Sequence, residues 1–533
     1  MTLRIARVPV LVRPEETPGG GYCRAVCRAD KAVDPPLLYS LARVTHPTVS
    51  VLFALGLLAA AGVARASVPL VLQPCELQDT LRVRSVTAEC GTLSVPEDPQ
   101  APGGRHIRLH VARVPAINRR KLPDPLFVFA GGPGMAATEF YASASFAFEW
   151  IHRDRDIVLV DQRGTGESNP LTCALDDDEL YRATDAQIAT QTQQCLAALK
   201  PRARVELYTT SVAVKDLDQA RAALGYDSID LYGVSYGTRV AQHYLRRFPE
   251  HVRSVILDGV VPPQLALGPA MAANAEAALT RILARCASQT ECHTHFGDPA
   301  LAYQAVRASL QSHPAPVSLY GPTSGQPAKF EFTPYHLAAV LRLSTYTSEQ
   351  AALLPLMLHQ AADSRDFTAL ASQFLLVSRS YRDAIAYGMH NSIVCSEDVP
   401  FYDEGSVNRA EMQKTFLGTT QLDGLRNICR VWPRGPMDAD FHAPIHTDKP
   451  VLLLSGSDDP VTPPANAELA RRGFTHSLHV VLQGFGHGQL TAPCVGRVMA
   501  RFLDAAAAAG LDVSCTKADR PMPFFITLGG PPP

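Results

Sequence analysis

The sequence predicts an α/β fold in which a mostly parallel central sheet carries an inserted helical cap domain. Short runs that are apolar on both sides are typical of strands buried in a parallel sheet, and helical segments such as 213–224 lie between them. These runs are residues 125–130, 157–160, 229–234, 255–257, 451–454 and 478–482. They stop between 262 and 445 and then resume, which favours an insertion over an independent downstream domain.

The N-terminal residues 1–66 are predicted to be a signal peptide with a long N-terminal extension. The apolar run 49–63 is shorter than a bilayer-spanning helix, and the A-x-A pattern at 64–66 matches a cleavage site before Ser67. We therefore expect export to the periplasm or the medium without stable membrane insertion after cleavage, and a retained anchor is the alternative. Because residues 1–40 exceed a usual charged n-region, either translation starts downstream or the n-region is extended.

The remaining chain is predicted to form the sheet domain in two parts, 67–261 and 446–515, around the cap insertion 262–445. Apolar and polar residues alternate over 75–116, with proline and glycine breaks, which predicts antiparallel edge strands. The predicted cap helices are 270–287, 333–343, 348–362 and 367–387. Residues 516–533, which end in GGPPP, are expected to form a poorly ordered tail.

The stretch 229–237, IDLYGVSYG, carries the first candidate catalytic residue, Ser235. A buried strand precedes this serine, and an amphipathic helix over 238–248 follows it and ends at Pro249. A G-x-S-x-G turn in this context pushes the hydroxyl out above the sheet, and the helix N-terminus beside it suits an oxyanion. Ser235 is therefore the predicted nucleophile, and a chance pentapeptide is the alternative.

A nucleophilic serine needs a base and an acid, which α/β hydrolases place downstream in the order Asp, His. The segment SDDPVTPP follows the run 451–454 and QGFGHG follows the run 478–482, so both lie where open α/β sheets build active sites. Asp459 is the predicted acid, with Asp458 as its exposed neighbour, because adjacent side chains on a loop point differently. His487, which lies between two glycines, is the predicted base.

The glycine-rich turn 131–134, GGPG, follows the first buried strand of the predicted parallel sheet. Hydrolases of this fold supply a second oxyanion N–H from this place, and glycine lets the backbone approach a substrate carbonyl closely. We expect the backbone amides of Gly132 and Tyr236 to form the oxyanion hole. The alternative for the GGPG turn is an ordinary turn between two elements with no catalytic role.

Charge and cysteine content exclude some classes of partner. A formal net charge of −2 and a pI near 6.8 offer no basic face for nucleic acid. Ten of the 12 cysteines follow residue 66, and an even number in an exported protein favours disulfides. Pairing in sequence order would give five modest loops, although spacing does not determine connectivity. Cys292, His293 and His295 could instead hold a metal, but we expect a disulfide and no metal site.

Five motifs occur in a characteristic order: FAGGPG at 129–134, VDQRGTGES at 160–168, GVSYG at 233–237, SDDPVTPP at 457–464 and GFGHG at 484–488. Together they resemble the proline iminopeptidase and tripeptidyl aminopeptidase family of α/β-hydrolase serine exopeptidases. Ala130 stands where cytosolic iminopeptidases usually have histidine, a position that varies in the secreted tripeptidyl aminopeptidase-like branch, which weakens the case for proline specificity. The resemblance implies the same triad, Ser235, Asp459 and His487, and removal of residues from free peptide N-termini.

The resemblance also implies how a peptide substrate is held. The family's acidic cap residues bind the substrate ammonium, and VCSEDVPF at 394–401 resembles its cysteine-acid-proline segment. Glu397 and Asp398 are therefore candidate amine anchors, with a solvated acidic turn as the alternative. We expect a secreted serine aminopeptidase that works by acyl transfer without metal or organic cofactor. A secreted carboxylesterase with the same triad and a non-catalytic hydrolase-fold binding protein are the alternatives.

Overall fold

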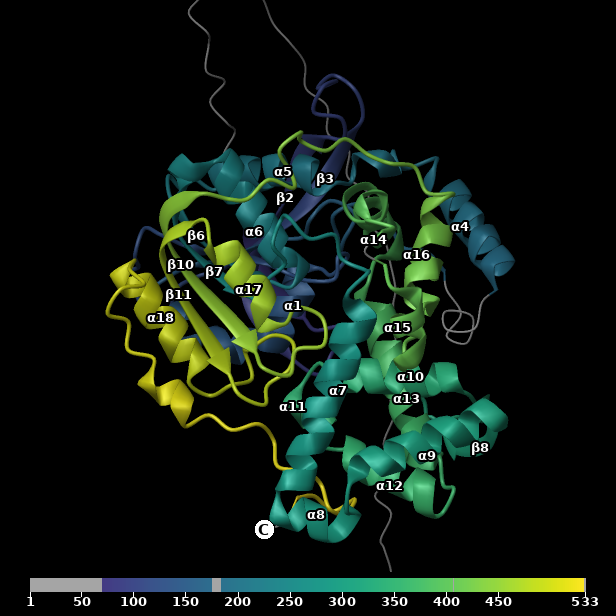
Figure 1. Cartoon of the computed structure of the whole chain (residues 1–533). Coiled ribbons are helices and arrows are strands. Elements are labelled where there is room, and N and C mark those ends of the chain that lie inside the picture. Colours follow the sequence, from purple (N-terminus) through teal and green to yellow (C-terminus); the bar gives the residue numbers. More distant parts are fainter. Residues whose placement is uncertain (1–69, 175–183, 406, 532–533) are drawn as a thin grey trace, which may run out of the picture. The chain divides into compact units, whose positions relative to one another are not determined.

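A nine-stranded sheet forms the centre of the structure, a computed structural model that describes residues 70–174, 184–405 and 407–531 (Figure 1). The predicted signal peptide and its extension, residues 1–66, lie outside the described residues. In the sheet the strands lie in the order β1 (Gln73–Gln78), β2 (Ser85–Pro96), β3 (His106–Val114), β5 (Ile157–Val160), β4 (Leu126–Phe129), β6 (Ile229–Val234), β7 (Val252–Asp258), β10 (Thr447–Gly456) and β11 (Phe474–Leu482).

The direction of the strands matches the predicted α/β class. The first three strands are antiparallel, as the alternating pattern of residues 75–116 predicts, and β3 is antiparallel to β5. From β5 to β11 every neighbouring pair is parallel. The carboxyl ends of β4, β6, β7, β10 and β11 therefore share one edge of the sheet, where loops can assemble a site.

Helices cover both faces of the sheet. The helices outside the stretch between β7 and β10 are α1 (Ala137–Ala144), η1 (Ser145–Phe148), α2 (Glu149–His152), α4 (Asp185–Leu199), η2 (Val205–Leu207), α5 (Thr210–Ala223), α6 (Tyr236–Arg247), η3 (Pro249–His251), α17 (Pro464–Arg471), α18 (Val495–Ala505) and η5 (Ser514–Lys517). Alternate residues of a strand point to opposite faces. In β10, Val451 and Leu453 pack in the core with α5, α6 and α17, whereas Leu452 and Leu454 pack in the core with α1, α2 and α18.

Between β7 and β10 the chain forms a helical segment (Figure 1). Its helices are α7 (Met271–Ser288), α8 (Thr290–Phe296), α9 (Pro299–Ser312), α10 (Pro334–Ser344), α11 (Ser348–Ala351), α12 (Leu354–Asp363), α13 (Thr368–Ala384), α14 (Tyr387–Glu397), η4 (Val399–Phe401), α15 (Arg409–Lys414) and α16 (Thr420–Cys429). Leu283, Leu341 and Phe374 belong to a buried core that is separate from the two cores on the sheet. In contrast, Met389 and Ile393 of α14 pack in the core that β10 shares with α5, α6 and α17.

Three details of this segment differ from the prediction. The predicted helix 348–362 is divided, and Pro355, which has no N–H to donate, lies in the first turn of α12. The predicted helix 367–387 ends at Ala384 and a new helix begins at Tyr387. The segment also contains an antiparallel pair, β8 (Ala315–Tyr320) and β9 (Pro327–Phe332), which packs against α13 and so gains the burial that an isolated hairpin lacks.

The C-terminal segment is better ordered than its composition predicts. The expectation of a poorly ordered tail over 516–533 is wrong for the described residues up to 531. Phe524 is buried in a cluster with side chains of α7, α8 and α12, and the guanidinium of Arg285 lies 4.6 Å from its ring centroid. The N–H of Phe525 donates to Ala352 O at 3.1 Å. These partners come from distant segments, so tertiary packing orders a segment that has no periodic pattern of its own.

Among the described residues, five disulfides join cysteines that follow one another in the sequence: Cys75–Cys90, Cys173–Cys195, Cys286–Cys292, Cys395–Cys429 and Cys494–Cys515. Cys292 is thus bridged, as expected, rather than part of a metal cluster with His293 and His295. Five bridges are typical of a protein that folds outside the cytoplasm. Within the described residues, no helix has both the length and the apolar composition needed to cross a bilayer.

Candidate active site

Ser235 lies in the sharp turn between β6 and α6, at the carboxyl edge of the sheet. Its backbone has φ 56° and ψ −125°, and a residue held in such a sparsely populated region stores about 1–3 kcal/mol of strain. The turn is fixed by the N–H of Ser235, which donates to Asp258 O at 2.9 Å, and by the hydroxyl of Thr238, which donates to Ser235 O at 2.6 Å. Ser235 remains partly exposed, whereas Val234 and Tyr236 are buried.

The two glycines of the G-x-S-x-G turn are required by close backbone contact. A Cβ atom on Gly233 would overlap the carbonyl oxygen of Gly237, and a Cβ on Gly237 would overlap the carbonyl oxygen of Phe129 in β4. Only glycine allows this approach of strand, turn and helix. The pattern seen in the sequence therefore reports a steric requirement of the turn.

Asp459 and His487 meet in the loops after β10 and β11. His487 Nδ1 lies 2.9 Å from Asp459 Oδ2. The other carboxylate oxygen of Asp459 accepts the N–H groups of Val461 at 2.8 Å and Thr462 at 2.7 Å, and the Thr462 hydroxyl donates to Oδ2 at 2.8 Å. The Asp459 side chain is fully buried and that of His487 is 8% exposed. The bond at Nδ1 leaves Nε2 of the imidazole as the nitrogen for another partner.

Electrostatics favour a charged pair at this position. Burial alone would raise the pKa of Asp459, but the charge of His487 and the hydrogen bonds from His487, Thr462 and Val461 lower it. Burial likewise lowers the pKa of His487, but the charge and hydrogen bond of Asp459, together with the charge of Asp258, raise it above its ordinary value. The arrangement therefore stabilises an imidazolium, the form that a general base takes after accepting a proton.

The loop that carries His487 lies against the turn that carries Ser235. Strands β6, β7, β10 and β11 are consecutive in the sheet, so their following loops are neighbours. Gly488 lies beside Val234, since a Cβ on the glycine would be 3.7 Å from Val234 Cγ2. The N–H of Gln489 donates to both carboxylate oxygens of Asp258, at 3.0 and 2.8 Å. The structure thus brings the three predicted triad residues to one region of the sheet edge.

The glycine-rich turn after β4 also lies against the nucleophile. A Cβ on Gly131 would be 3.1 Å from Ser235 Cβ, and Gly132 has a φ of +105°. Tyr236 is the first residue of α6, and the first N–H groups of a helix have no intrahelical acceptor. Of the predicted donors of the oxyanion hole, Tyr236 therefore follows Ser235 directly in the chain, and Gly132 follows Gly131, which lies against Ser235. Their role as donors stays a prediction.

Asp458 is not the exposed neighbour that the sequence predicts. Its residue is 5% exposed, and its carboxylate lies 3.3 Å from Arg281 Nε and 3.8 Å from an Arg285 terminal nitrogen. Both arginines belong to α7, so Asp458 joins the loop of Asp459 to the inserted helices. The sequence does not indicate this role, because the two arginines lie far away along the chain.

Glu397 and Asp398 are both buried at the end of α14. Glu397 accepts the N–H of Thr210 at 2.7 Å and the Thr210 hydroxyl at 2.9 Å. Asp398 accepts the N–H of Leu267 at 2.7 Å and a guanidinium N–H of Arg239 at 3.0 Å. Burial raises the pKa of Glu397 to about 7. Both carboxylates thus have partners within the chain, which contradicts the alternative of a solvated acidic turn, and the amine anchor stays a prediction.

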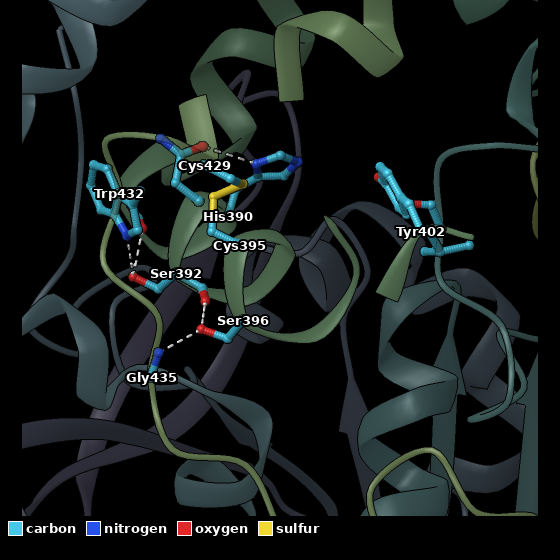
Figure 2. Close-up of a disulfide and its surroundings, with 11 residues drawn as sticks. His390, Ser392, Cys395, Ser396, Tyr402, Cys429, Trp432 and Gly435 are labelled. Carbon is cyan, nitrogen blue, oxygen red and sulfur yellow. Dashed lines mark hydrogen bonds between the residues drawn. A yellow bond between two sulfur atoms is a disulfide. The ribbon is translucent and has the colours of Figure 1, made fainter. Parts of the chain in front are cut away.

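The segment before these carboxylates is rigidly fixed. The Cys395–Cys429 disulfide joins α14 to α16, and the indole N–H of Trp432 donates to Ser392 Oγ at 3.0 Å (Figure 2). The hydroxyl of Ser396 donates to Ser392 O at 2.7 Å (Figure 2). Glu397 and Asp398 are therefore held by a network that leaves their backbone little freedom.

Two further residues contact the imidazole of His487 and are absent from the sequence prediction. The Thr462 hydroxyl lies 3.0 Å from Nδ1, and its place in the motif SDDPVTPP is the local signal that could have found it. The ring of Tyr346, just after α10, lies 5.1 Å from the His487 ring in an edge-on arrangement, and Tyr346 O accepts the N–H of His487 at 2.7 Å. No motif marks Tyr346.

In a comparison with known proteins, two family models match the parts of the chain that carry the three candidate triad residues. A family model described as alpha/beta hydrolase fold matches residues 124–292, which include Ser235, and one described as TAP-like protein matches residues 414–515, which include Asp459 and His487. Serine protease Hip1 of Mycobacterium tuberculosis is 28% identical over 427 residues, which cover 72% of this chain and 79% of that protein.

Two other relatives carry different names. Carboxylesterase B of Mycobacterium tuberculosis is 30% identical over 437 residues, which cover 74% of this chain and 80% of that protein. Tripeptidyl aminopeptidase of Streptomyces coelicolor is 33% identical over 192 residues, which cover 33% of this chain and 35% of that protein. The resemblance drawn from the five motifs is confirmed: the chain belongs to the TAP-like family of α/β-hydrolase serine hydrolases.

Proposed function

We propose that this chain is a secreted serine aminopeptidase that releases N-terminal residues or short peptides from peptides with a free amino terminus. Ser235 Oγ attacks the scissile carbonyl while His487 accepts its proton and then delivers it to the leaving amine. Asp459 orients the imidazole and stabilises its charged form. The N–H groups of Gly132 and Tyr236 bind the oxyanion, and water then hydrolyses the acyl-enzyme.

One observation carries the proposal: His487 Nδ1 is bound to a fully buried Asp459 at 2.9 Å, in a loop packed against the strained turn of Ser235. This bond selects the tautomer in which Nε2 is free to accept a proton from a serine hydroxyl. Side chains and water make every proton transfer in the mechanism, so no metal or organic cofactor takes part.

The relatives named serine protease and tripeptidyl aminopeptidase support a peptide substrate. A carboxylesterase with the same triad is the second candidate, because a relative named carboxylesterase B covers 74% of this chain. The burial of Glu397 and Asp398 also favours it, since an esterase needs no group to bind an ammonium.

The test compares free and N-acetylated peptide amides of one, two and three residues with a small neutral ester. An aminopeptidase cleaves the free peptides and leaves the acetylated ones nearly untouched, because the ammonium contributes binding energy that acetylation removes. Ser235→Ala, the matched control, should cleave none of them. Equal cleavage of free and acetylated peptides would refute the aminopeptidase, and cleavage of the ester alone would favour the carboxylesterase.

Glu397→Gln and Asp398→Asn test the predicted amine anchor. Each amide can keep the hydrogen bonds of the acid, since Thr210 bonds Glu397 through one donor N–H and one hydroxyl, and both donors to Asp398 bind a single oxygen. If either carboxylate pairs with the substrate ammonium, kcat/KM for free peptides should fall by a factor that corresponds to about 2 to 4 kcal/mol of lost transition-state stabilisation. The kcat/KM for the ester should change little.

The control for these variants is Glu404→Gln, which changes an exposed acid that pairs with Arg426 in the same segment. An anchor role is refuted if Glu397→Gln and Asp398→Asn change the ratio of peptide to ester cleavage no more than the control does. The carboxylates would then act only through the buried contacts described above.

Export to the periplasm or the medium is the remaining part of the proposal. It predicts a mature protein that begins near Ser67 and has no free thiol, because all ten remaining cysteines are paired. Mass spectrometry of alkylated, non-reduced protein measures both properties. A mature form that retains residues 1–66, or that carries two or more alkylated cysteines, contradicts it.

A further inference from the structure

We propose that Asp258 and Gly259, which end β7 and begin the following loop, are positioning residues that hold His487 in its reactive orientation toward Ser235. The inference rests on the roles proposed above for Ser235 and His487. Neither residue belongs to the predicted triad or to the predicted oxyanion hole. Their positions connect the nucleophile turn, the imidazole and the loop that carries it.

Asp258 binds both the turn that carries Ser235 and the loop that carries His487. Its backbone oxygen accepts the N–H of Ser235 at 2.9 Å. Its buried carboxylate accepts the N–H of Gln489 through both oxygens, at 3.0 and 2.8 Å, and the hydroxyl of Tyr232 at 2.9 Å. The Gln489 side chain in turn donates to Gly486 O at 2.9 Å, which closes the turn around His487. A shift of Asp258 therefore moves the nucleophile and the base relative to each other.

Gly259 lies next to the imidazole of His487. A Cβ at this position would be 3.2 Å from His487 Cε1, 3.4 Å from Nδ1 and 3.1 Å from Thr462 Oγ1. The φ of Gly259 is +63°, a conformation that glycine adopts without cost, and its N–H donates to Leu454 O at 3.0 Å. With a Cβ here, the ring or the threonine that holds it would have to shift by a few tenths of an ångström.

The charge of Asp258 also acts on the imidazole. The charged and titratable groups that face His487 are Asp459, Asp258 and Arg342, with Tyr346 against the ring. Asp459 and Asp258 raise the pKa of His487, whereas Arg342 lowers it. Burial raises the pKa of Asp258 itself to about 6, and the ionised carboxyl supports the imidazolium.

Asp258→Asn separates a positioning role from a merely structural one. The amide oxygen can accept the N–H of Gln489 at only one of the two positions, so in either orientation the NH₂ group faces that N–H, and the charge is lost. We expect kcat for a small neutral ester to fall by roughly 10- to 100-fold with KM nearly unchanged, because a small misplacement of the base costs this much. The acid limb of the pH profile of kcat/KM should move to lower pH, since an anion that raises the pKa of His487 is gone.

Asp230→Asn is the matched control. Asp230 is another buried carboxylate with a raised pKa, but it lies near the start of β6, at the opposite end of the strand from Ser235, where it contacts Arg253 and Ser254. This variant should keep the acid limb of the wild type. A second positioning variant, Gly259→Ala, should lower kcat at least about tenfold because its Cβ meets the ring.

The proposal is overturned if Asp258→Asn keeps the wild-type acid limb and a kcat within twofold of the wild type, or if Asp230→Asn moves the limb equally. It is also overturned if Gly259→Ala is fully active, a result that remains decisive if Asp258→Asn does not fold. Because the ester reports on the triad alone, failure to cleave free-amine peptides would count against the aminopeptidase and leave this comparison valid. Activity retained by Ser235→Ala would count against the proposed nucleophile itself.

Discussion

Replacing Asp459 by asparagine should nearly abolish activity, whereas the same change at the adjacent Asp458 should not. Asp459 accepts four hydrogen bonds, from Val461 N–H, Thr462 N–H, the Thr462 hydroxyl and His487 Nδ1. An asparagine side chain has one acceptor oxygen, so in either orientation its NH₂ group faces two donors. If that group faces His487, the imidazole takes the tautomer with Nε2 protonated and cannot act as a base.

From this loss we expect Asp459→Asn to lower kcat/KM by about four orders of magnitude, or about 5 kcal/mol. Asp458→Asn removes two ion pairs with α7, one of them to Arg281, whose side chain is 43% exposed. Because solvent screens such a pair, kcat/KM should change less than about tenfold.

The assay is kcat/KM for a chromogenic substrate at neutral pH, with near-ultraviolet circular dichroism and the Tm of each variant as folding controls. The two variants differ by one position and by the same chemical change, so general effects of introducing an amide cancel. The reasoning is refuted if Asp458→Asn is as damaging as a triad knockout while Asp459→Asn stays active, since the acid is then Asp458.

The remaining predictions use the same protein. Ser235→Ala should lose reaction with a fluorophosphonate probe and keep the Tm of the wild type, and a labelled variant would show that another nucleophile is present. The kcat/KM of the wild type should fall as the pH drops through the pKa of His487, since the base must be neutral. Burial lowers this pKa but the neighbouring carboxylates raise it, so the acid limb should lie above that of an ordinary histidine, and an acid limb on the other side counts against this direction. Phe524→Ala should lower the free energy of unfolding in urea by about 3–5 kcal/mol, while Leu528→Ala, which changes a side chain that is 75% exposed, should leave it nearly unchanged. Equal effects of the last two variants would mean that the C-terminal segment does not pack on the helices in solution.

The fold class could be predicted from the sequence because its signals are local. A strand buried on both faces is apolar at every position, and an inserted helical segment interrupts such runs without ending them. The turn around Ser235 is equally local, since Gly233 and Gly237 are required by backbone contacts within a few residues and with the adjacent strand. The order of the three candidate triad residues along the chain then follows from the family that these motifs resemble.

Other features depend on contacts between distant segments, and only the tertiary structure decided them. Asp458 and Asp459 share the same local sequence, but one points to the arginines of α7 and the other to His487. The local sequence around Glu397 is typical of a solvated acidic turn. In the structure, however, Thr210, from a helix on the sheet, binds the Glu397 carboxylate in the interior. The ordering of Phe524 likewise requires a surface built by the inserted helices.

Asp258 shows most clearly the difference between what the local sequence indicates and what tertiary contacts decide. In the sequence it is an aspartate before a glycine at the end of a buried run, as expected of any strand that enters a turn. Its hydrogen bonds to the Ser235 turn and to the Gln489 N–H arise because parallel strands bring loops that are distant in sequence to one edge of the sheet. The sequence by itself determined which loops carry the candidate catalytic groups, and the sheet determined which buried groups hold them in place, because burial and hydrogen bonding depend on neighbours that local sequence does not specify.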